Sequence, residues 1–302
     1  MRISVVGSYG VGMTMYMQRM PLEGETTVGR SFAQGPGGKG SNQAIAARRL
    51  GADVTLCSIV GPDALGAEAR RLWTEEGIGI DGVRTGMAPT MVGFILVEPD
   101  GANRIIIAPG ALDELRAEDV RACATEIEAA DVVLVSLEIP LAAASEALRI
   151  GDAAGVATVL NPAPATRLSA ELLARVRHIT PNRTEAAVLT GLDSTSSADA
   201  LIDGIRALAP DVVIVLTLGE DGVVVDDGTR SSVAAMRAPA VIDTAGAGDA
   251  FSAAYAVAIA EGESPLAAAR LGVTAGAFAV TRREVVPGLG TRAELEAFAA
   301  GA

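Results

Sequence analysis

The sequence predicts a doubly wound α/β fold, in which a mostly parallel sheet is covered by helices on both faces. Short, continuously apolar runs rich in β-branched residues alternate with alanine-rich stretches of helical length. Such runs are typical of parallel strands buried on both faces, and their alternation with helices predicts right-handed crossovers. The expected strands are 3–6, 54–60, 132–135, 158–160 and 212–216, and the expected helices are 42–50, 64–76, 141–154, 170–176 and 198–207.

Two stretches interrupt this alternation and predict a small β lid. Residues 26–34 and 91–107 look like hairpin strands, and both flank the same part of the sheet. We therefore expect one domain over residues 1–302, with a lid formed by about 10–35 and 88–110 at the active-site edge of the sheet. Exposed strands and apolar faces need partners, so the lid also predicts a homodimer.

Composition narrows the class of function. A formal charge of −13 and only 3% aromatic residues argue against a nucleic-acid partner. No apolar run reaches the roughly 18 residues that span a bilayer, and glycine follows the first strand too soon for a signal peptide, so we expect a cytoplasmic protein without membrane contact. Cys57 and Cys123 lie in apolar sequence, which favours buried thiols over a disulfide. His178 is the only histidine, which excludes Ser-His-Asp and Cys-His catalysis and most zinc sites.

A loop of small residues ends in the carboxylate of Asp249, just before the apolar run 252–260. The backbone N–H groups of Gly246, Ala247 and Gly248 point out of a helix N-terminus, where an anion binds readily. A carboxylate beside an anion site makes sense if it accepts a proton from a hydroxyl while the N–H groups stabilise charge on a phosphoryl group. The alternative is an acidic first-turn residue of an ordinary core helix.

Two glycine-rich segments near the N-terminus differ in what they can bind. Residues 35–43 allow close approach to the backbone, and Lys39 and Asn42 add a point charge and an amide for a hydroxyl-rich ligand. The spacing is not that of a P-loop, and a bare glycine turn is the alternative. Residues 7–12 read G-x-x-G-x-G and lack the acidic partner of a dinucleotide site, which argues against a Rossmann dehydrogenase.

Two later segments follow expected strands and offer groups for a metal and a nucleotide. Asn182 and Glu185 share one helical face and suit a Mg²⁺ ion held mostly through water, although the pair also fits a helix cap. The turn at Thr217, Gly219 and Gly222 lies at the carboxyl end of a strand, where nucleotide phosphates or ribose can rest. A hairpin without a ligand explains that turn nearly as well.

Taken together, these segments resemble the ribokinase/PfkB family of carbohydrate kinases over nearly the whole chain. The order and spacing of the blocks carry the resemblance, which is closest to the ribokinases at 137–140 and 161–165. It implies transfer of the γ-phosphoryl group of ATP to the primary hydroxyl of a sugar. The matching blocks are Gly37-Gly-Lys-Gly-Ser-Asn-Gln, Leu137-Glu-Ile-Pro, Asn161-Pro-Ala-Pro-Ala, Thr180-Pro-Asn-Arg-Thr-Glu, Thr217-Leu-Gly and Asp243-Thr-Ala-Gly-Ala-Gly-Asp-Ala-Phe.

The resemblance also implies a role for each residue that matches a family motif. Asp249 would be the general base, and the backbone from Ala245 to Gly248 would form the anion hole. Asn182 and Glu185 would organise Mg²⁺ and its waters. The nucleotide would lie along Asn182, Thr217, Gly219 and Gly222. The sugar would contact Gly38, Lys39, Asn42, Glu138 and Asp249. An activating K⁺ would lie among Asp243, Ala245, Ala279, Arg282, Glu284 and Gly288, where Gly288 stands in place of a frequent serine.

The main departure from the family concerns the acceptor. Ribokinases usually carry an Asn and an Asp after the first strand, whereas Gly10 and Gly12 occupy those positions here, with three methionines close by. A hydrogen bond to a charged group contributes about 1.5–3 kcal/mol, so we expect an acceptor with fewer hydroxyls there or with an apolar or larger substituent. D-Ribose or a related pentose or deoxy sugar leads, and nucleosides, hexoses and keto sugars follow. A non-catalytic sugar- or nucleotide-binding regulator is the alternative from another class.

Overall fold

The computed structural model describes residues 1–100 and 102–301 and confirms the expected doubly wound α/β fold. A nine-stranded sheet lies at its centre, parallel except where its last two strands add antiparallel at one edge. Gly101 and Ala302, which belong to the expected lid and domain ranges, lie outside the described residues. The strand order is β13 (Arg230–Val233), β12 (Val223–Asp226), β11 (Val213–Thr217), β10 (His178–Ile179), β9 (Ala157–Asn161), β8 (Val132–Ser136), β1 (Arg2–Val6), β4 (Asp53–Val60) and β5 (Val83–Thr85).

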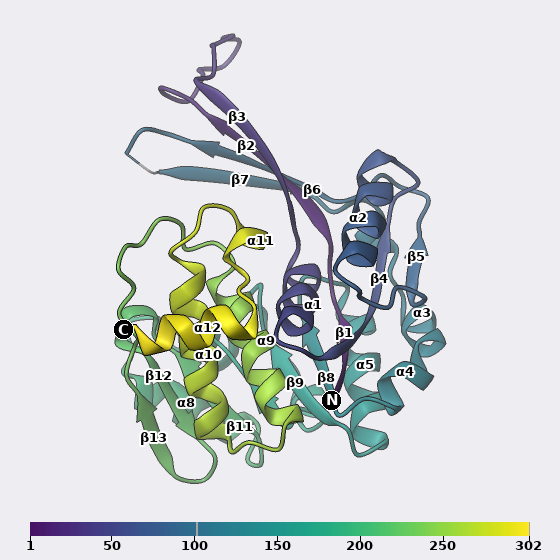
Figure 1. Ribbon diagram of the computed structural model, residues 1–302, viewed down its shortest axis with the longest axis vertical. Helices are drawn as coiled ribbons and strands as arrows, with labels where there is room; N and C mark the ends of the chain where they lie inside the picture. Colours follow the sequence, from purple (N-terminus) through teal and green to yellow (C-terminus); the bar gives the residue numbers. More distant parts are fainter. Residues whose placement is uncertain (101, 302) are drawn as a thin grey trace.

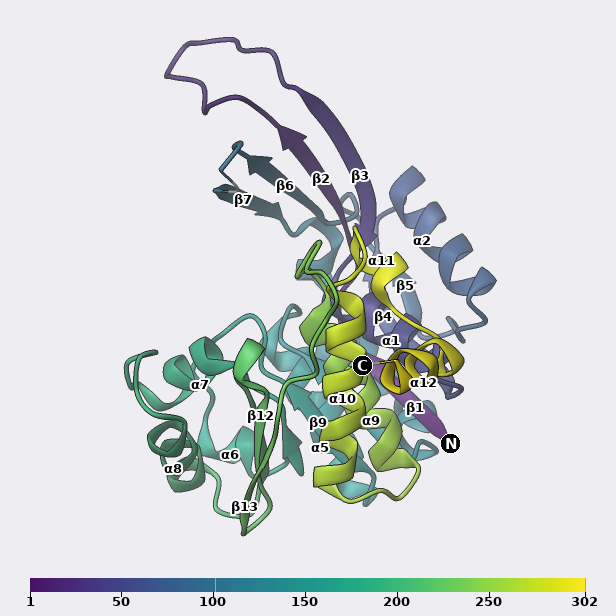
Figure 2. The ribbon, with the colours of Figure 1, turned by 60° about the vertical axis from the view of Figure 1, so that its left-hand side comes forward.

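Helices cover both faces of this sheet, and each face buries its own apolar core (Figures 1 and 2). Successive residues of a strand point to opposite faces, so Leu56 enters one core and Cys57 the other. The first core lies under α1 (Lys39–Arg49), α2 (Ala64–Glu75), α9 (Ala247–Ala260), α10 (Pro265–Ala279) and α12 (Arg292–Ala300). The second lies under α3 (Ala117–Ala122), α4 (Ala124–Glu128), α5 (Leu141–Ala153), α6 (Ala170–Leu173), α7 (Arg183–Thr190) and α8 (Ala198–Leu208).

A second, four-stranded sheet projects from the body beyond the carboxyl end of β1 (Figure 1). Its order is β3 (Ser31–Gly37), β2 (Gly10–Tyr16), β6 (Val92–Val97) and β7 (Asn103–Ala108). The expectation of a strand over 26–34 was wrong at its start, because the strand begins at Ser31 and continues through the glycines to Gly37. The expected helix at 42–50 likewise begins three residues early, at Lys39.

The beginning of α1 fits against the end of β1 because two glycine backbones touch there. A Cβ atom on Gly40 would lie 2.4 Å from the carbonyl carbon of Gly7 and 2.5 Å from its Cα. Gly38, which precedes the helix, has a φ of +89° and would place a Cβ 2.6 Å from the Cα of Tyr9. Only glycine permits this approach, which fixes α1 over the carboxyl end of the sheet.

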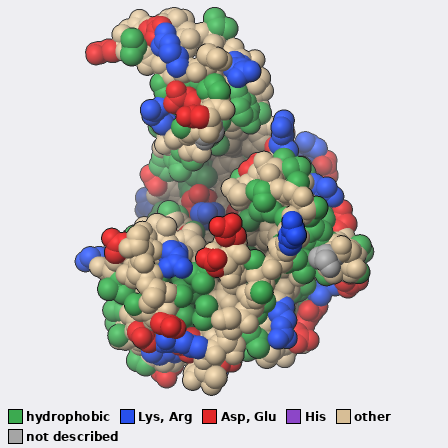
Figure 3. All heavy atoms as spheres, turned by 90° about the vertical axis from the view of Figure 1, so that its left-hand side faces the viewer, with side chains coloured by type: hydrophobic (Ala, Val, Ile, Leu, Met, Phe, Trp, Pro, Cys, Tyr) green, Lys and Arg blue, Asp and Glu red, His purple; other side chains and the backbone are tan. Residues whose placement is uncertain are grey.

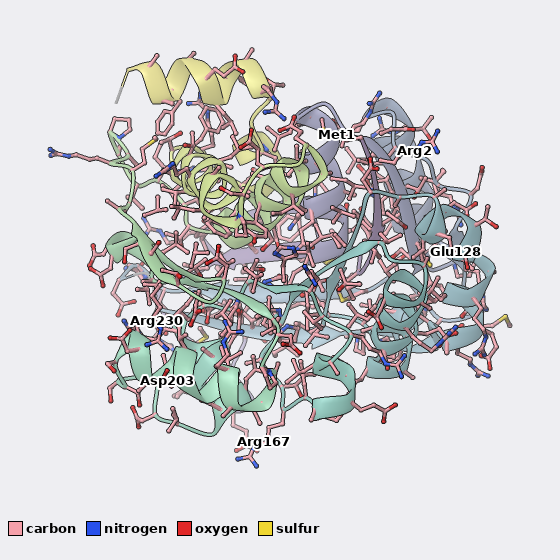
Figure 4. All side chains as sticks on the ribbon, turned by 90° about the horizontal axis from the view of Figure 1, so that it is seen from below. Met1, Arg2, Glu128, Arg167, Asp203 and Arg230 are labelled. Carbon is pink, nitrogen blue, oxygen red and sulfur yellow. The ribbon has the colours of Figure 1, made fainter. Side chains whose placement is uncertain are left out.

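The antiparallel edge of the large sheet is tied to α8 by a cluster of charges. Arg230 on β13 pairs with Asp226, Asp199 and Asp203, and Figure 4 shows Arg230 and Asp203 together on the underside of the molecule. Asp226 is buried, whereas the two acidic partners on α8 are exposed, so water screens those two pairs and they add little stability. None of the helices within the described residues has the length and hydrophobicity that crossing a membrane requires.

Candidate active site

The order of the strands reverses beside β1, which creates an opening at the carboxyl ends of β1 and β8. From β1 the sheet continues through β4 on one side and through β8 on the other. Ligands of doubly wound sheets bind at such a switch point. The loops meet there: Ser8 Oγ donates to Glu138 Oε2 at 2.5 Å, and the backbone N–H of Lys39 donates to the same oxygen at 2.9 Å. Glu138, expected to contact the sugar, is therefore held at the mouth of the site.

Asp249 lies in the first turn of α9, and the packing of α1 against α9 surrounds its carboxylate. Asn42 Nδ2 donates to Oδ2 at 2.8 Å, and Gln43 Nε2 donates to Oδ1 at 3.2 Å. The side chain is 6% exposed. Burial raises the pKa of Asp249 above its usual value, while the charge of Lys39 and the two amide donors partly oppose the rise. The carboxylate is thus desolvated and fixed in place, as a group that accepts a proton requires.

Lys39 is the cation of this site and lies among three carboxylates. Burial alone lowers its pKa, but the charges of Asp249, Glu138 and Glu185 outweigh that effect and the pKa rises. Lys39 therefore stays an ammonium group at neutral pH. Burial in turn raises the pKa of Glu185, against the lowering effect of a backbone hydrogen bond and of Lys39. Local positive charge is thus present at this opening although the protein as a whole is acidic.

A cavity of about 220 Å³ opens above α9 and the carboxyl ends of the neighbouring strands. Figure 3 shows the molecule hollowed between the small sheet and the body, with acidic and basic side chains in the hollow. The expected site residues that line the cavity are Lys39, Asn182, Glu185, Thr217, Gly246, Gly248 and Asp249. Lining residues that sequence reasoning did not assign are Asn161, Ala163, Thr180, Thr244, Phe251 and Ser252.

Asn182 and Glu185 form a helix cap as well as part of the cavity wall. Asn182 Oδ1 accepts from the backbone N–H of Glu185 at 2.8 Å. The Glu185 carboxylate accepts from the backbone N–H and the side-chain amide of Asn182, both at 2.8 Å. The capping alternative is thus present in the structure, and the remaining carboxylate lone pairs face a cavity where hydrated metal can bind.

The residues of the turn after β11 differ in their relation to the cavity. Thr217 lines the cavity. Gly222 has a φ of +90°, and a Cβ there would lie 2.2 Å from the carbonyl oxygen of Val233. This crowding requires glycine without any ligand, which favours the hairpin interpretation at Gly222. Gly219 also has a positive φ, of 62°, but a Cβ there meets no atom within 4 Å, which leaves its position open to a ligand.

The loop before α9 is closed by contacts to the segment after α10. Gly246, the N-cap residue of α9, has a φ of 77°, and a Cβ there would lie 2.4 Å from Cγ1 of Val285 in α11 (Val285–Gly288). A Cβ on Gly248 meets no atom within 4 Å. One side of the loop is therefore packed, while the side at Gly248 has room for an anion to approach the amides of the first turn, including that of Ala247.

The residues expected around K⁺ converge on this same loop. Asp243 accepts from the backbone N–H of Ala245 at 2.9 Å and of Glu284 at 3.2 Å. A Cβ on Gly288 would lie 3.0 Å from the carbonyl oxygen of Ala279, so the two chain segments touch there. Oxygen donors of this kind fit a hard cation. The guanidinium of Arg282 instead turns over the Phe278 ring, 5.1 Å from its centroid.

Gly10 and Gly12 lie at the root of β2 beside apolar side chains. A Cβ on Gly10 would lie 2.3 Å from Cε of Met91, and one on Gly12 would lie 3.6 Å from Cδ1 of Ile95. Gly12 pairs with Gly35, whose Cβ would lie 3.8 Å from Oε2 of Glu284. Paired residues share a face of a sheet, so this face is directed toward Glu284 and the body. Met91 therefore fills the space that a side chain at position 10 would need.

Comparison with known proteins gives the family. The chain matches the pfkB family of carbohydrate kinases over residues 3–292. It is 35% identical over 300 residues to a ribokinase of Haemophilus influenzae, covering 97% of this chain and 96% of the relative. It is 34% identical over 295 residues to a deoxyribokinase of Salmonella typhi, covering 93% of each.

A solved ribokinase structure agrees with this family assignment. Arabidopsis thaliana ribokinase complexed with ribose and ATP superposes with a TM-score of 0.90 at 27% identity and covers 98% of both chains. These findings confirm the expectation of an ATP-dependent sugar kinase with a ribokinase-like fold. The chain belongs to the pfkB family of carbohydrate kinases.

Proposed function

We propose that this kinase transfers the γ-phosphoryl group of ATP to the primary hydroxyl of a pentose or deoxypentose, with Asp249 as general base. The observation that carries the proposal is the buried Asp249 carboxylate, which two amide groups hold at the N-terminus of α9. The hydroxyl oxygen of the acceptor attacks the γ-phosphorus while its proton passes to Asp249, and the bond from that phosphorus to ADP, the leaving group, breaks. The amides from Gly246 to Gly248 and the ammonium of Lys39 stabilise the charge on the transferred group.

The acceptor that fits best lacks a hydroxyl on the side facing β2. Gly10 and Gly12 supply no polar side chain, and Met91 and Ile95 lie against them. A hydroxyl buried there without a partner would lose the hydrogen bonds that it makes in water. The relatives include both ribokinases and deoxyribokinases, and this apolar wall favours a deoxypentose over ribose.

Both parts of the proposal can be tested by measuring ADP production with ATP, Mg²⁺ and K⁺ present. The acceptors to compare are pentoses, deoxy sugars, hexoses, ketoses and nucleosides. We expect a deoxypentose to give the highest kcat/KM, and we expect Asp249→Asn to lower kcat at least about 10²-fold. Saturation by ribose at low concentration with full turnover would contradict the apolar-wall argument. Binding of sugar and ATP without acceptor-dependent ADP release would instead identify a regulatory protein on a kinase scaffold.

We propose two cations. Mg²⁺ would bind mainly through ATP phosphates and water, with Glu185 and Asn182 orienting the waters, and it would neutralise phosphate charge. K⁺ would bind carbonyl oxygens of the loops around Asp243 and Ala279. Within the described residues, no three acidic, Cys or His side chains cluster as a metal site, which is consistent with ions held by water, phosphate and backbone. A rise in thermal stability with KCl but not with choline chloride would support the K⁺ site.

We propose that the small sheet is the lid and that it pairs two copies of this chain. Phe32, Phe94 and Ile106 are 55%, 48% and 64% exposed, and strand register places them on the face opposite Gly12. Ile105 and Ile107, 57% and 53% exposed, lie on the other face, so the small sheet exposes apolar side chains of the kind that mark a protein interface. Phe94→Asp should give a monomer by light scattering, whereas Val241→Asp, on the body, should leave a dimer. A wild-type monomer would contradict the pairing.

A further inference from the structure

Two side chains behind Asp249 form a series in which each hydrogen bond fixes the orientation of the next group. Asn161 Nδ2 donates to the carbonyl oxygen of Thr180 at 3.3 Å. Because a carbonyl only accepts, Asn161 must direct its NH₂ group there and its Oδ1 away. That Oδ1 accepts from Gln43 Nε2 at 3.1 Å, and the second N–H of Gln43 donates to Asp249 Oδ1 at 3.2 Å. The carbonyl oxygen of Thr180, just after β10, thus fixes the orientation of Asn161. Asn161 in turn directs the NH₂ group of Gln43, and not its Oε1, at the Asp249 carboxylate.

We propose that Gln43 is a positioning residue that holds the Asp249 carboxylate oriented to take the acceptor's proton, with Asn161 fixing the direction of the Gln43 amide. The inference rests on the proposed role of Asp249 as general base. Gln43 is fully buried, and Asn161 and Asp249, which line the cavity, are each 6% exposed, so water has little access to these bonds.

The opposite orientation of Gln43 is excluded by charge. Rotating the amide would direct Oε1 at the carboxylate, where two acceptors repel each other. In the observed orientation Gln43 Oε1 is buried and has no hydrogen-bond partner among the described residues. A buried acceptor without a partner is unfavourable. The observed orientation therefore indicates that the hydrogen bond from Gln43 Nε2 to Asp249 contributes more than the unpaired Oε1 costs.

Gln43 and Asn42 divide the two oxygens of the base between them. Asn42 Nδ2 donates to Oδ2, and its own Oδ1 is buried without a partner among the described residues. If Asn42 turns to a sugar hydroxyl, as the resemblance implies, Gln43 stays as the amide donor that keeps Asp249 in place. The charged groups that act on Asp249 from other directions are Lys39, Glu138 and Glu185, and none is altered in the variants below.

The test is the pH dependence of kcat with the best acceptor in Gln43→Met, which keeps the length of the side chain and removes the donor. A carboxylate that loses a donor is protonated at higher pH. The acid limb of kcat should therefore move up by about one pH unit, equivalent to about 1.4 kcal/mol. The KM for ATP should stay unchanged. Glu263→Met, at an exposed side chain between α9 and α10, is the control and should leave the limb in place.

Asn161→Leu tests the orientation step, because it frees the Gln43 amide to rotate. We expect a shift in the same direction, and we expect the double variant with Gln43→Met to shift no further than Gln43→Met alone. Gln43→Glu keeps the shape and adds a second carboxyl, so its acid limb should move higher still. This variant decides the matter if Gln43→Met does not fold.

An acid limb at the wild-type pH in both Gln43 variants would overturn the inference, however much kcat falls. Additive shifts in the double variant would overturn the role of Asn161. Failure of the proposed function looks different: Asp249→Asn would then keep wild-type turnover. An inactive Asp249→Asn with an unmoved limb in the Gln43 variants would refute only the role of Gln43.

Discussion

A single methyl group at Gly40 should disturb both the stability and the catalysis of this kinase. In Gly40→Ala the new Cβ would lie 2.4 Å from the carbonyl carbon of Gly7 and 2.5 Å from the backbone nitrogen of Ser8. All three of the nearest atoms belong to backbone, so no side chain can rotate away. The only relief is a movement of the first turn of α1 away from the end of β1.

The size of that movement follows from ordinary contact distances. Carbon atoms pack at about 3.5–4.0 Å, so the helix start must move by about 1 Å. Overpacking of this kind typically lowers the free energy of unfolding by about 1–3 kcal/mol. The bond from Gln43 to Asp249 is already 3.2 Å long and would leave hydrogen-bonding range. A misplacement of about 1 Å can lower turnover about 10²-fold.

Thermal unfolding and steady-state kinetics measure the two effects separately. For a chain of 302 residues, about 1–3 kcal/mol corresponds to a fall in Tm of roughly 2–5 °C. Gly301→Ala is the matched control, because the nearest atom to a Cβ at Gly301 would be the carbonyl oxygen of Ala297 at 3.7 Å, an ordinary contact; its Tm and kcat should equal those of the wild type. If Gly40→Ala behaved like Gly301→Ala, the close approach of α1 to β1 would not position the site.

Three further predictions concern stability and reactivity. Burial lowers the pKa of His178 to about 4, so the folded state should lose stability as the pH drops below about 6.5, the pKa of histidine in the unfolded chain. Urea unfolding should show about 2 kcal/mol less stability at pH 5 than at pH 7, and His178→Gln should lack this difference. Glu284 has a φ of 67°, which strains a residue with a side chain, so Glu284→Gly should raise the free energy of unfolding in urea by about 0.5–1 kcal/mol. Cys57 and Cys123 are buried free thiols, so a disulfide reagent should label both only in urea, and native labelling would contradict their burial.

Strands that are buried on both faces could be predicted from the sequence, whereas β2 and β10, which depend on pairing with strands distant in the sequence or are very short, could not. β1, β4, β8, β9 and β11 are apolar because helices cover both of their faces, and that composition is visible without a structure. β2 was missed because Gly10 and Gly12 suggest a loop, and its partner β6 lies about eighty positions away. β10 has only two residues, too few to carry a pattern.

The candidate site divides in the same way. Asp249 and Lys39 could be found because a carboxylate at a helix start and a lysine among glycines are local signals. Gln43 stands beside Asn42 in the same block, yet its contact with Asp249 spans 206 positions, which no local pattern reveals. Met91 was missed for the same reason, since its role depends on where β6 passes Gly10. At Gly222 the crowding of the chain requires glycine with or without a nucleotide, so this glycine by itself does not indicate a nucleotide site.

The separation of Asn42 and Gln43 from Asp249 has a consequence for how the protein becomes active. The contacts that hold the Asp249 carboxylate span 207 and 206 positions, so they form only after long loops close, a step that slows folding. A partly folded chain therefore holds no assembled catalytic site, and sugar and ATP bind the native state alone. Their binding adds stability in proportion to the logarithm of their concentration. Saturating sugar and ATP should therefore protect the folded enzyme from unfolding as well as supply its reaction.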